Sequence, residues 1–193
     1  IAGVTYLLSN AHVLAREGSV PATPVNADTN GNTGDNILQP GPADTECLFD
    51  LANDTVATLS AFVAFTNGDN EVDAAIALSS PADISDTTPA DGYGRIKSAV
   101  AGCTGPVGAE CSNLLGLAVQ KYGRTTALTK GTIVAIDFNL SVGYDTGSVS
   151  FVDQIIVEGN KGGFLRSGDS GSSLVADPNA NPVGLLFASA RGG

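Results

Sequence analysis

Methionine and tryptophan are absent from the 193-residue sequence, which contains only one histidine and three cysteines. A chain without methionine does not begin at its own start codon, and no targeting leader can be read from it. We therefore expect it to start inside a longer polypeptide. Its compartment is left open between the cell exterior and a bacterial cytoplasm. One histidine and three scattered cysteines without a C-x-x-C pair do not make a structural zinc site, and we expect no metal or organic cofactor.

Long apolar runs and basic residues are also scarce. There is no run of about 18 apolar residues, which argues against a membrane-spanning helix. Nine Lys and Arg residues stand against 20 Asp and Glu residues, and a net charge of −11 would repel the phosphates of a nucleic acid. We therefore expect no nucleic acid or membrane among the partners. The sequence leaves open whether the chain forms a homo-oligomer.

The odd number of cysteines allows two arrangements. Cys103 and Cys111 flank the short segment TGPVGAE and are close enough in sequence for a local disulfide, which would leave Cys47 as a free thiol. The alternative is three reduced thiols. The cysteines therefore do not decide the compartment.

The composition favours an all-β fold. Hydrophobic residues make up 42% and charged residues 15% of the chain, which is typical of a globular rather than a disordered protein. The 24 glycines, with many Thr, Val and Ser residues, suit short strands joined by turns. Segments with a strand pattern are 4–10, 56–65, 72–78, 117–122, 131–142, 148–157, 172–176 and 183–188.

Two segments rich in turn residues divide the chain. Residues 17–54 form a long loop, and residues 86–116 form a connector that contains Pro89, Gly92 and Pro106. We therefore divide the chain into an N-terminal domain over residues 1–85 and a C-terminal domain over residues 117–193. A loop as long as 17–54 is unusual inside a compact domain and often has a functional role.

The segment KGGFLRSGDSGSSLV contains a candidate nucleophile, Ser170, between Gly168 and Gly171. Glycines allow a tight turn that exposes a serine oxygen, and backbone N–H groups in such a turn can form an oxyanion hole. The predicted donors are the N–H groups of Gly168 and Ser170. Many Gly-Asp-Ser-Gly segments are ordinary loops, so the prediction needs a partner base.

The only histidine and one acid supply such partners. His12 follows the apolar segment YLLSNA, and Asp73 stands at the head of the apolar run AAIAL. A carboxylate buried there would need a partner, and an imidazole N–H would serve. The alternatives are a structural histidine and a turn-forming aspartate at the start of a strand.

The order His12, Asp73, Ser170 and the surrounding residues resemble the chymotrypsin-like serine proteases. SNAHVLA is similar to the histidine turn of that family, VDAAIAL to its aspartate strand and GDSGSSL to its serine loop. The chain looks closest to bacterial trypsin-like peptidases related to the plant NAL-one-like proteins. Further similar stretches, which extend the resemblance over most of the chain, are 37–44, 119–133 and 182–189.

The resemblance implies two antiparallel β-barrels of the six-stranded type, the first with His12 and Asp73 and the second with Ser170. Compared with the family, strands are missing at both ends, so we expect a chain truncated at both ends. The resemblance also implies that Asp169 is neutralised by Arg124 from the hairpin after residue 122. The alternative is a solvated Arg124.

The resemblance places the substrate pocket beside the residues before Ser170 and the strand of Phe187 and Ser189. Phe164 takes the position at the base of that pocket, where trypsin-type enzymes carry an aspartate. We therefore expect a small or apolar side chain in the pocket rather than Lys or Arg.

The predicted function is a serine endopeptidase that acts on a peptide or protein. The alternative is a catalytically silent protein that keeps the protease fold as a binding or assembly module. An α/β-hydrolase esterase is disfavoured because its serine would precede the acid and the histidine.

Overall fold

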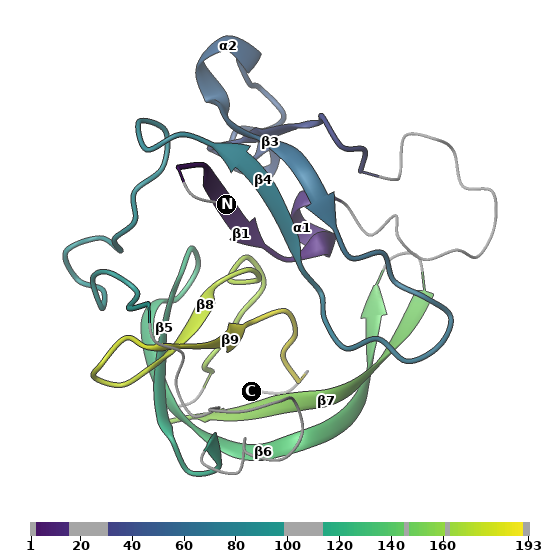
Figure 1. The fold of residues 1–193 in the computed structure, drawn as a ribbon, viewed down its shortest axis with the longest axis vertical. Coiled ribbons are helices and arrows are strands. Elements are labelled where there is room, and N and C mark those ends of the chain that lie inside the picture. Colours follow the sequence, from purple (N-terminus) through teal and green to yellow (C-terminus); the bar gives the residue numbers. More distant parts are fainter. Residues whose placement is uncertain (1–2, 16–30, 99–113, 145–146, 161–162, 191–193) are drawn as a thin grey trace.

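The structure, a computed structural model, describes residues 3–15, 31–98, 114–144, 147–160 and 163–190 (Figure 1). The described elements are nine strands and three short helices. The strands are β1 (Thr5–Ser9), β2 (Asn36–Leu38), β3 (Thr55–Phe62), β4 (Ala75–Ser79), β5 (Ala118–Gly123), β6 (Ala127–Tyr144), β7 (Gly147–Gly159), β8 (Ser173–Ala176) and β9 (Pro182–Leu185). The helices are α1 (Ala11–Leu14), the 3₁₀ helix η2 (Pro42–Asp44) and α2 (Leu51–Asp54).

The strands form two antiparallel sheets, one from each half of the chain. The first sheet has the order β1-β4-β3-β2, and the second has the order β7-β6-β5-β8-β9. Strands β4 and β3 are the inner strands of the first sheet, and Ala75 and Ala77 of β4 are buried. The predicted all-β fold class with two antiparallel sheets is confirmed. The described strands number four in one sheet and five in the other.

Strands β6 and β7 form a long hairpin that reaches from the second sheet toward the first (Figure 1). Their pairing is interrupted by register shifts, and Asp137 and Asp153, one on each strand, have positive φ angles of 52° and 58°. Such bulges bend and twist a strand. The bent hairpin joins the first sheet through Asn70, whose backbone N–H donates to the Ser150 carbonyl at 3.1 Å.

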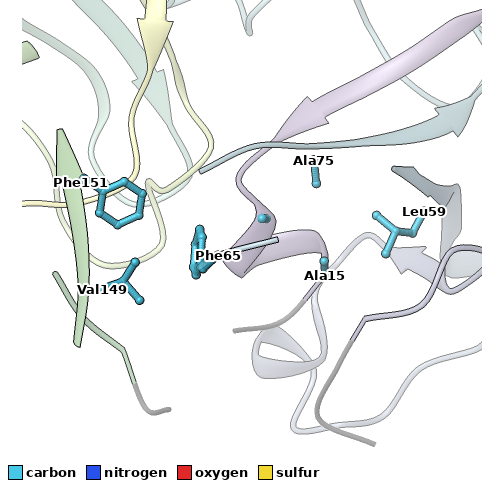
Figure 2. Close-up of a cluster of buried hydrophobic side chains, with 7 residues drawn as sticks. Ala15, Leu59, Phe65, Ala75, Val149 and Phe151 are labelled. Carbon is cyan, nitrogen blue, oxygen red and sulfur yellow. The ribbon is translucent and has the colours of Figure 1, made fainter. Parts of the chain in front are cut away.

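The tip of this hairpin completes the core of the N-terminal half. Figure 2 shows Val149 and Phe151 of β7 beside Phe65, which leads from β3 toward β4. All three side chains are at most 2% exposed. The same cluster contains Leu59 of β3 and Ala75 of β4. The two halves of the molecule therefore share one hydrophobic core.

A second core lies within the C-terminal half. Val119, Ile133 and Leu174 project from three neighbouring strands and are at most 3% exposed. Phe164, from the segment that leads to Ser170, packs into the same cluster. This core fixes the start of the candidate nucleophile loop against the sheet.

Most predicted strands are present, with shifted ends. The long loop contains β2, η2 and α2, although residues 16–30 lie outside the described residues. Cys47 is exposed and free, whereas Cys103 and Cys111 lie outside the described residues. In the described part of the chain, no helix has the length and apolar character needed to cross a membrane.

Candidate active site

His12 and Asp73 form a direct pair. His12 lies in the single turn of α1, and its Nδ1 is 2.5 Å from Asp73 Oδ2. The backbone N–H of His12 also donates to Asp73 Oδ1 at 3.2 Å. The Asp73 side chain has no exposed surface, and the His12 side chain is 16% exposed. Because Nδ1 donates to the carboxylate, Nε2 of the neutral ring is the acceptor.

The first sheet and its neighbouring turn hold this pair from behind. Asp73 lies two residues before β4, and α1 begins after Asn10, the residue that follows β1. Strand β1 pairs with β4 in the register Ser9 to Ala75. Asn10, which is fully buried, donates from Nδ2 to the backbone carbonyl of Asp73 at 2.8 Å. The hydroxyl of Tyr144 donates to Asp73 Oδ2 at 3.2 Å.

The predicted nucleophile loop is a tight turn that depends on its two glycines. Gly168 and Gly171 have φ angles of +92° and +86°, which residues with a side chain rarely adopt. Ser172 closes the turn by donating its backbone N–H to the Asp169 carbonyl at 3.0 Å. Gly171 N–H donates to the Leu186 carbonyl at 2.8 Å, which ties the loop to the chain after β9.

The loop lies directly against the histidine turn. A methyl group built on Gly171 would collide with the Ser9 hydroxyl and would lie 3.5 Å from Asn10 N. Ser170 therefore sits one residue from a close contact with the segment that carries His12. Within the described residues, the Ser170 hydroxyl has no hydrogen bond, so the structure contains the His12–Asp73 bond but no bond from His12 to Ser170.

The two predicted oxyanion donors are not used by the fold. Among the described residues, the backbone N–H groups of Gly168 and Ser170 donate no hydrogen bond to the protein. Ser170 itself is only partly buried. An unused N–H at a partly open turn is a donor that a bound oxyanion can accept from.

Asp169 has a different cationic partner from the one predicted. The Nζ of Lys121 on β5 lies 3.4 Å from Asp169 Oδ2, and neither side chain has any exposed surface. Arg124 instead pairs with Asp44 at the surface, with 61% of its side chain exposed. The prediction that Arg124 pairs with Asp169 is therefore wrong. Strand β5 directs Lys121 inward beneath the loop, whereas Arg124 lies in the exposed turn after the strand.

Further hydrogen bonds surround the Asp169 carboxylate. Its oxygens accept from the Thr126 hydroxyl at 2.7 Å and from the backbone N–H groups of Thr125 and Arg166 at 2.8 and 3.0 Å. Burial alone would raise the pKa of Asp169, but these hydrogen bonds prevail and lower the pKa to about 2. Burial lowers the pKa of Lys121, and Asp169 partly offsets this effect.

A cavity of about 200 Å³ opens beside the His12–Asp73 pair. Asp73 and Phe187 both line it, together with Val72 and Ala188. Phe164 does not, because its ring is 7% exposed and packs in the core with Leu174. The place of Phe164 at the base of a substrate pocket stays a prediction. Ser189 is exposed and does not line this cavity.

Sequence reasoning missed Lys121 and Tyr144. A lysine inside the strand AVQKYG gives little sign of burial, although its register puts it on the same side as the buried Val119. Tyr144 carries a clearer signal, because it continues the alternation of Leu140 and Val142 along β6. In the described part of the chain, no cluster of His, Cys, Asp and Glu residues could hold a metal ion.

Comparison with known proteins agrees with this architecture. The family model described as the Nal1 C-terminal domain matches residues 63–192, a range that holds Asp73 and Ser170 but not His12. No curated protein matches the chain.

Two solved structures cover nearly the whole chain. A glutamic acid-specific serine protease that utilizes a histidine triad in substrate binding is 19% identical over 98% of this chain and 75% of its own, with a TM-score of 0.57. Protease A of Thermobifida fusca is 15% identical over 95% of this chain and 69% of its own, with a TM-score of 0.52. A chymotrypsin of Cellulomonas bogoriensis is 25% identical, with a TM-score of 0.46, and the match spans 61% of that protein. The chain has the chymotrypsin-like serine protease fold and belongs to the Nal1 C-terminal domain family.

Proposed function

We propose that this chain is a serine endopeptidase that cleaves peptide bonds through an acyl-enzyme. The observation that carries the proposal is the buried contact of 2.5 Å between His12 Nδ1 and Asp73 Oδ2, on a turn against which the Ser170 loop packs. An imidazole held in this way presents Nε2 as a base. The close approach of Gly171 to Ser9 supports the assignment of Ser170 as the group that Nε2 serves.

The reaction begins when Ser170 Oγ forms a bond to the scissile carbonyl carbon and its proton passes to His12 Nε2. The C–N bond then breaks, and His12 Nε2 delivers that proton to the leaving amine. Water attacks the resulting ester by the same route and restores Ser170. Asp73 holds the His12 ring in place and stabilises the imidazolium.

The unused N–H groups of Gly168 and Ser170 would bind the oxyanion that forms at the carbonyl oxygen. Each donor contributes on the order of 3 kcal/mol to the stabilisation of the transition state. The substrate is a peptide or protein, and the mechanism uses no metal or organic cofactor. Phe187 in the wall of the nearby cavity provides an apolar surface for a substrate side chain.

The specificity of the solved relatives does not carry over residue by residue. The glutamic acid-specific relative uses a histidine triad to bind its substrate. This chain has a single histidine, and that residue is paired with Asp73. Recognition of glutamate by three histidines is therefore not part of our proposal.

The test is covalent labelling with a fluorophosphonate probe. We expect the folded chain to be labelled, and the Ser170→Ala variant to remain unlabelled. Ser173→Ala, which changes a serine in the neighbouring strand β8, is the matched control and should label like the parent. A folded parent chain that takes up no label contradicts the proposal.

A second candidate is a catalytically silent module with the protease fold. It is favoured by the missing hydrogen bond between Ser170 and His12 in the described structure. Catalytic hydrogen bonds are often long in the absence of substrate, so geometry alone does not decide against the enzyme. The labelling experiment separates the two functions.

A further inference from the structure

Tyr144, the last residue of β6, contacts both members of the His12–Asp73 pair. Its hydroxyl lies 3.2 Å from Asp73 Oδ2, and its ring centroid lies 5.5 Å from that of His12 at an angle of 55°. Tyr144 belongs to the second sheet, whereas His12 lies in α1 after β1 and Asp73 lies just before β4, next to the first sheet. A single side chain therefore connects the C-terminal half to the buried pair.

The Tyr144 ring is supported by other aromatic rings. It lies 5.2 Å from the ring of Phe65, which makes an edge contact of 5.5 Å with Phe151, and Phe151 in turn lies 4.7 Å from Phe187. Packing against Phe65 in the common core restricts where the Tyr144 hydroxyl can point. Phe187 follows Leu186, whose carbonyl receives the Gly171 N–H of the nucleophile loop.

Three donors hold the Asp73 carboxylate in one orientation. The His12 backbone N–H occupies Oδ1, while His12 Nδ1 and the Tyr144 hydroxyl share Oδ2. Since the Asp73 side chain has no exposed surface, solvent cannot replace a lost donor without rearrangement. A buried carboxylate that loses a hydrogen bond also loses part of what keeps it in one orientation.

We propose that Tyr144 is a positioning residue for the triad, which fixes the Asp73 carboxylate against His12 from the opposite half of the molecule. This inference rests on the proposed function. Tyr144 reaches neither the substrate nor Ser170 in this role, and it acts only through Asp73 and the His12 ring. The Nal1 C-terminal domain match covers Tyr144 and Asp73 together, so the contact lies within the matched range.

The first test compares two tyrosine variants in the full chain. Tyr144→Phe removes the donor to Asp73 and keeps the ring, and Tyr122→Phe removes a similar donor, 3.0 Å from Asp91 Oδ1, outside the site. Because a hydrogen bond to a buried charge is lost, we expect the maximal rate of fluorophosphonate labelling to fall about tenfold in Tyr144→Phe. The probe concentration for half-maximal rate should stay close to that of Tyr122→Phe, whereas the urea midpoint should be lower because the lost hydrogen bond is buried. Labelling rates are therefore compared without urea, where both variants are folded.

The second test needs no activity. The chain has one histidine, so a downfield proton resonance from an Nδ1–H bonded to a carboxylate has only one source. Without the Tyr144 hydroxyl, Asp73 Oδ2 interacts more strongly with the His12 proton, and we expect the resonance to move further downfield. It should not move in Tyr122→Phe.

An unchanged resonance in folded Tyr144→Phe overturns the inference, and so does an unchanged labelling rate in a chain that labels. If the parent chain takes up no label while the resonance still moves in Tyr144→Phe, the proposed function fails but the contact to Asp73 stands. The two failures are therefore distinguishable.

Discussion

Lys121 Nζ lies 3.4 Å from Asp169 Oδ2 in a part of the protein where both side chains are fully buried. The same ammonium group donates to the Thr126 hydroxyl and to the Ala127 carbonyl, and Asp169 is the residue before the predicted nucleophile. A cation supplied by strand β5 therefore neutralises the acid of the loop.

Lys121→Met should destabilise the protein strongly. The substitution leaves the Asp169 carboxylate buried without its cation, and the loss of one member of a buried pair costs about 3 kcal/mol or more. Urea denaturation measures the change in the free energy of unfolding. Lys130→Met is the control, because Lys130 pairs with Asp177 in a partly exposed position and should cost less than about 1 kcal/mol. Equal losses in both variants would contradict a structural role for the buried pair.

Arg124→Ala should have little effect. Arg124 forms a surface pair with Asp44, and such pairs contribute less than about 1 kcal/mol. We expect the urea midpoint and the labelling rate to stay close to those of the parent chain. A loss as large as that of Lys121→Met would mean that Arg124 neutralises Asp169 after all.

Asp169 should make stability depend on acid pH. Its pKa is about 2 in the folded protein and 3.8 ordinarily, so the unfolded chain takes up the proton at a higher pH than the folded chain. The contribution of Asp169 is therefore fully present above about pH 4 and is lost as the pH falls toward 2. The effect of Asp169 on stability is measured from the free energies of unfolding of the parent chain and of Asp169→Asn between pH 2 and about pH 4. We expect a flatter pH profile in Asp169→Asn than in the partly exposed control Asp177→Asn, and parallel profiles would refute the assignment.

Gly171→Ala should disrupt the nucleophile loop. The added methyl group meets the Ser9 hydroxyl, and the φ angle of +86° is unfavourable for alanine. We expect a loss of about 2 kcal/mol or more in the free energy of unfolding, and a loss of labelling even at temperatures where the variant is folded. Gly184→Ala on β9 is the matched control, because a methyl group there meets no atom within 4 Å. Full labelling of Gly171→Ala would contradict the close packing of the loop on the histidine turn.

The sequence could predict those features that depend on a pattern among neighbouring residues. Alternation placed most strands, and the local motifs around His12, Asp73 and Ser170 gave the fold class. The order of the motifs implied that His12 and Asp73 meet. Their distance depends on the pairing of β1 with β4, which the sequence does not show.

The contacts that the sequence could not predict join side chains that lie far apart in the sequence. Arg124 and Lys121 are three positions apart, and only the burial of β5 decides which of them reaches Asp169. Phe164 packs into the core of the second sheet, a contact that its position six residues before Ser170 does not reveal. The contact of Tyr144 with Asp73 could not be predicted, because it depends on where the bent β6–β7 hairpin ends in space.

Because the β6–β7 hairpin contacts the N-terminal half, the surroundings of the His12–Asp73 pair are completed late in synthesis. His12 and Asp73 leave the ribosome early, whereas Tyr144, Val149 and Phe151 are synthesised later and must travel back to the N-terminal half. Contacts between such distant segments form slowly, since a long loop must close first. A nascent chain therefore carries the histidine and the acid before it has the means to hold them. The side chains around the His12–Asp73 pair are therefore complete only after β6 and β7 have been made.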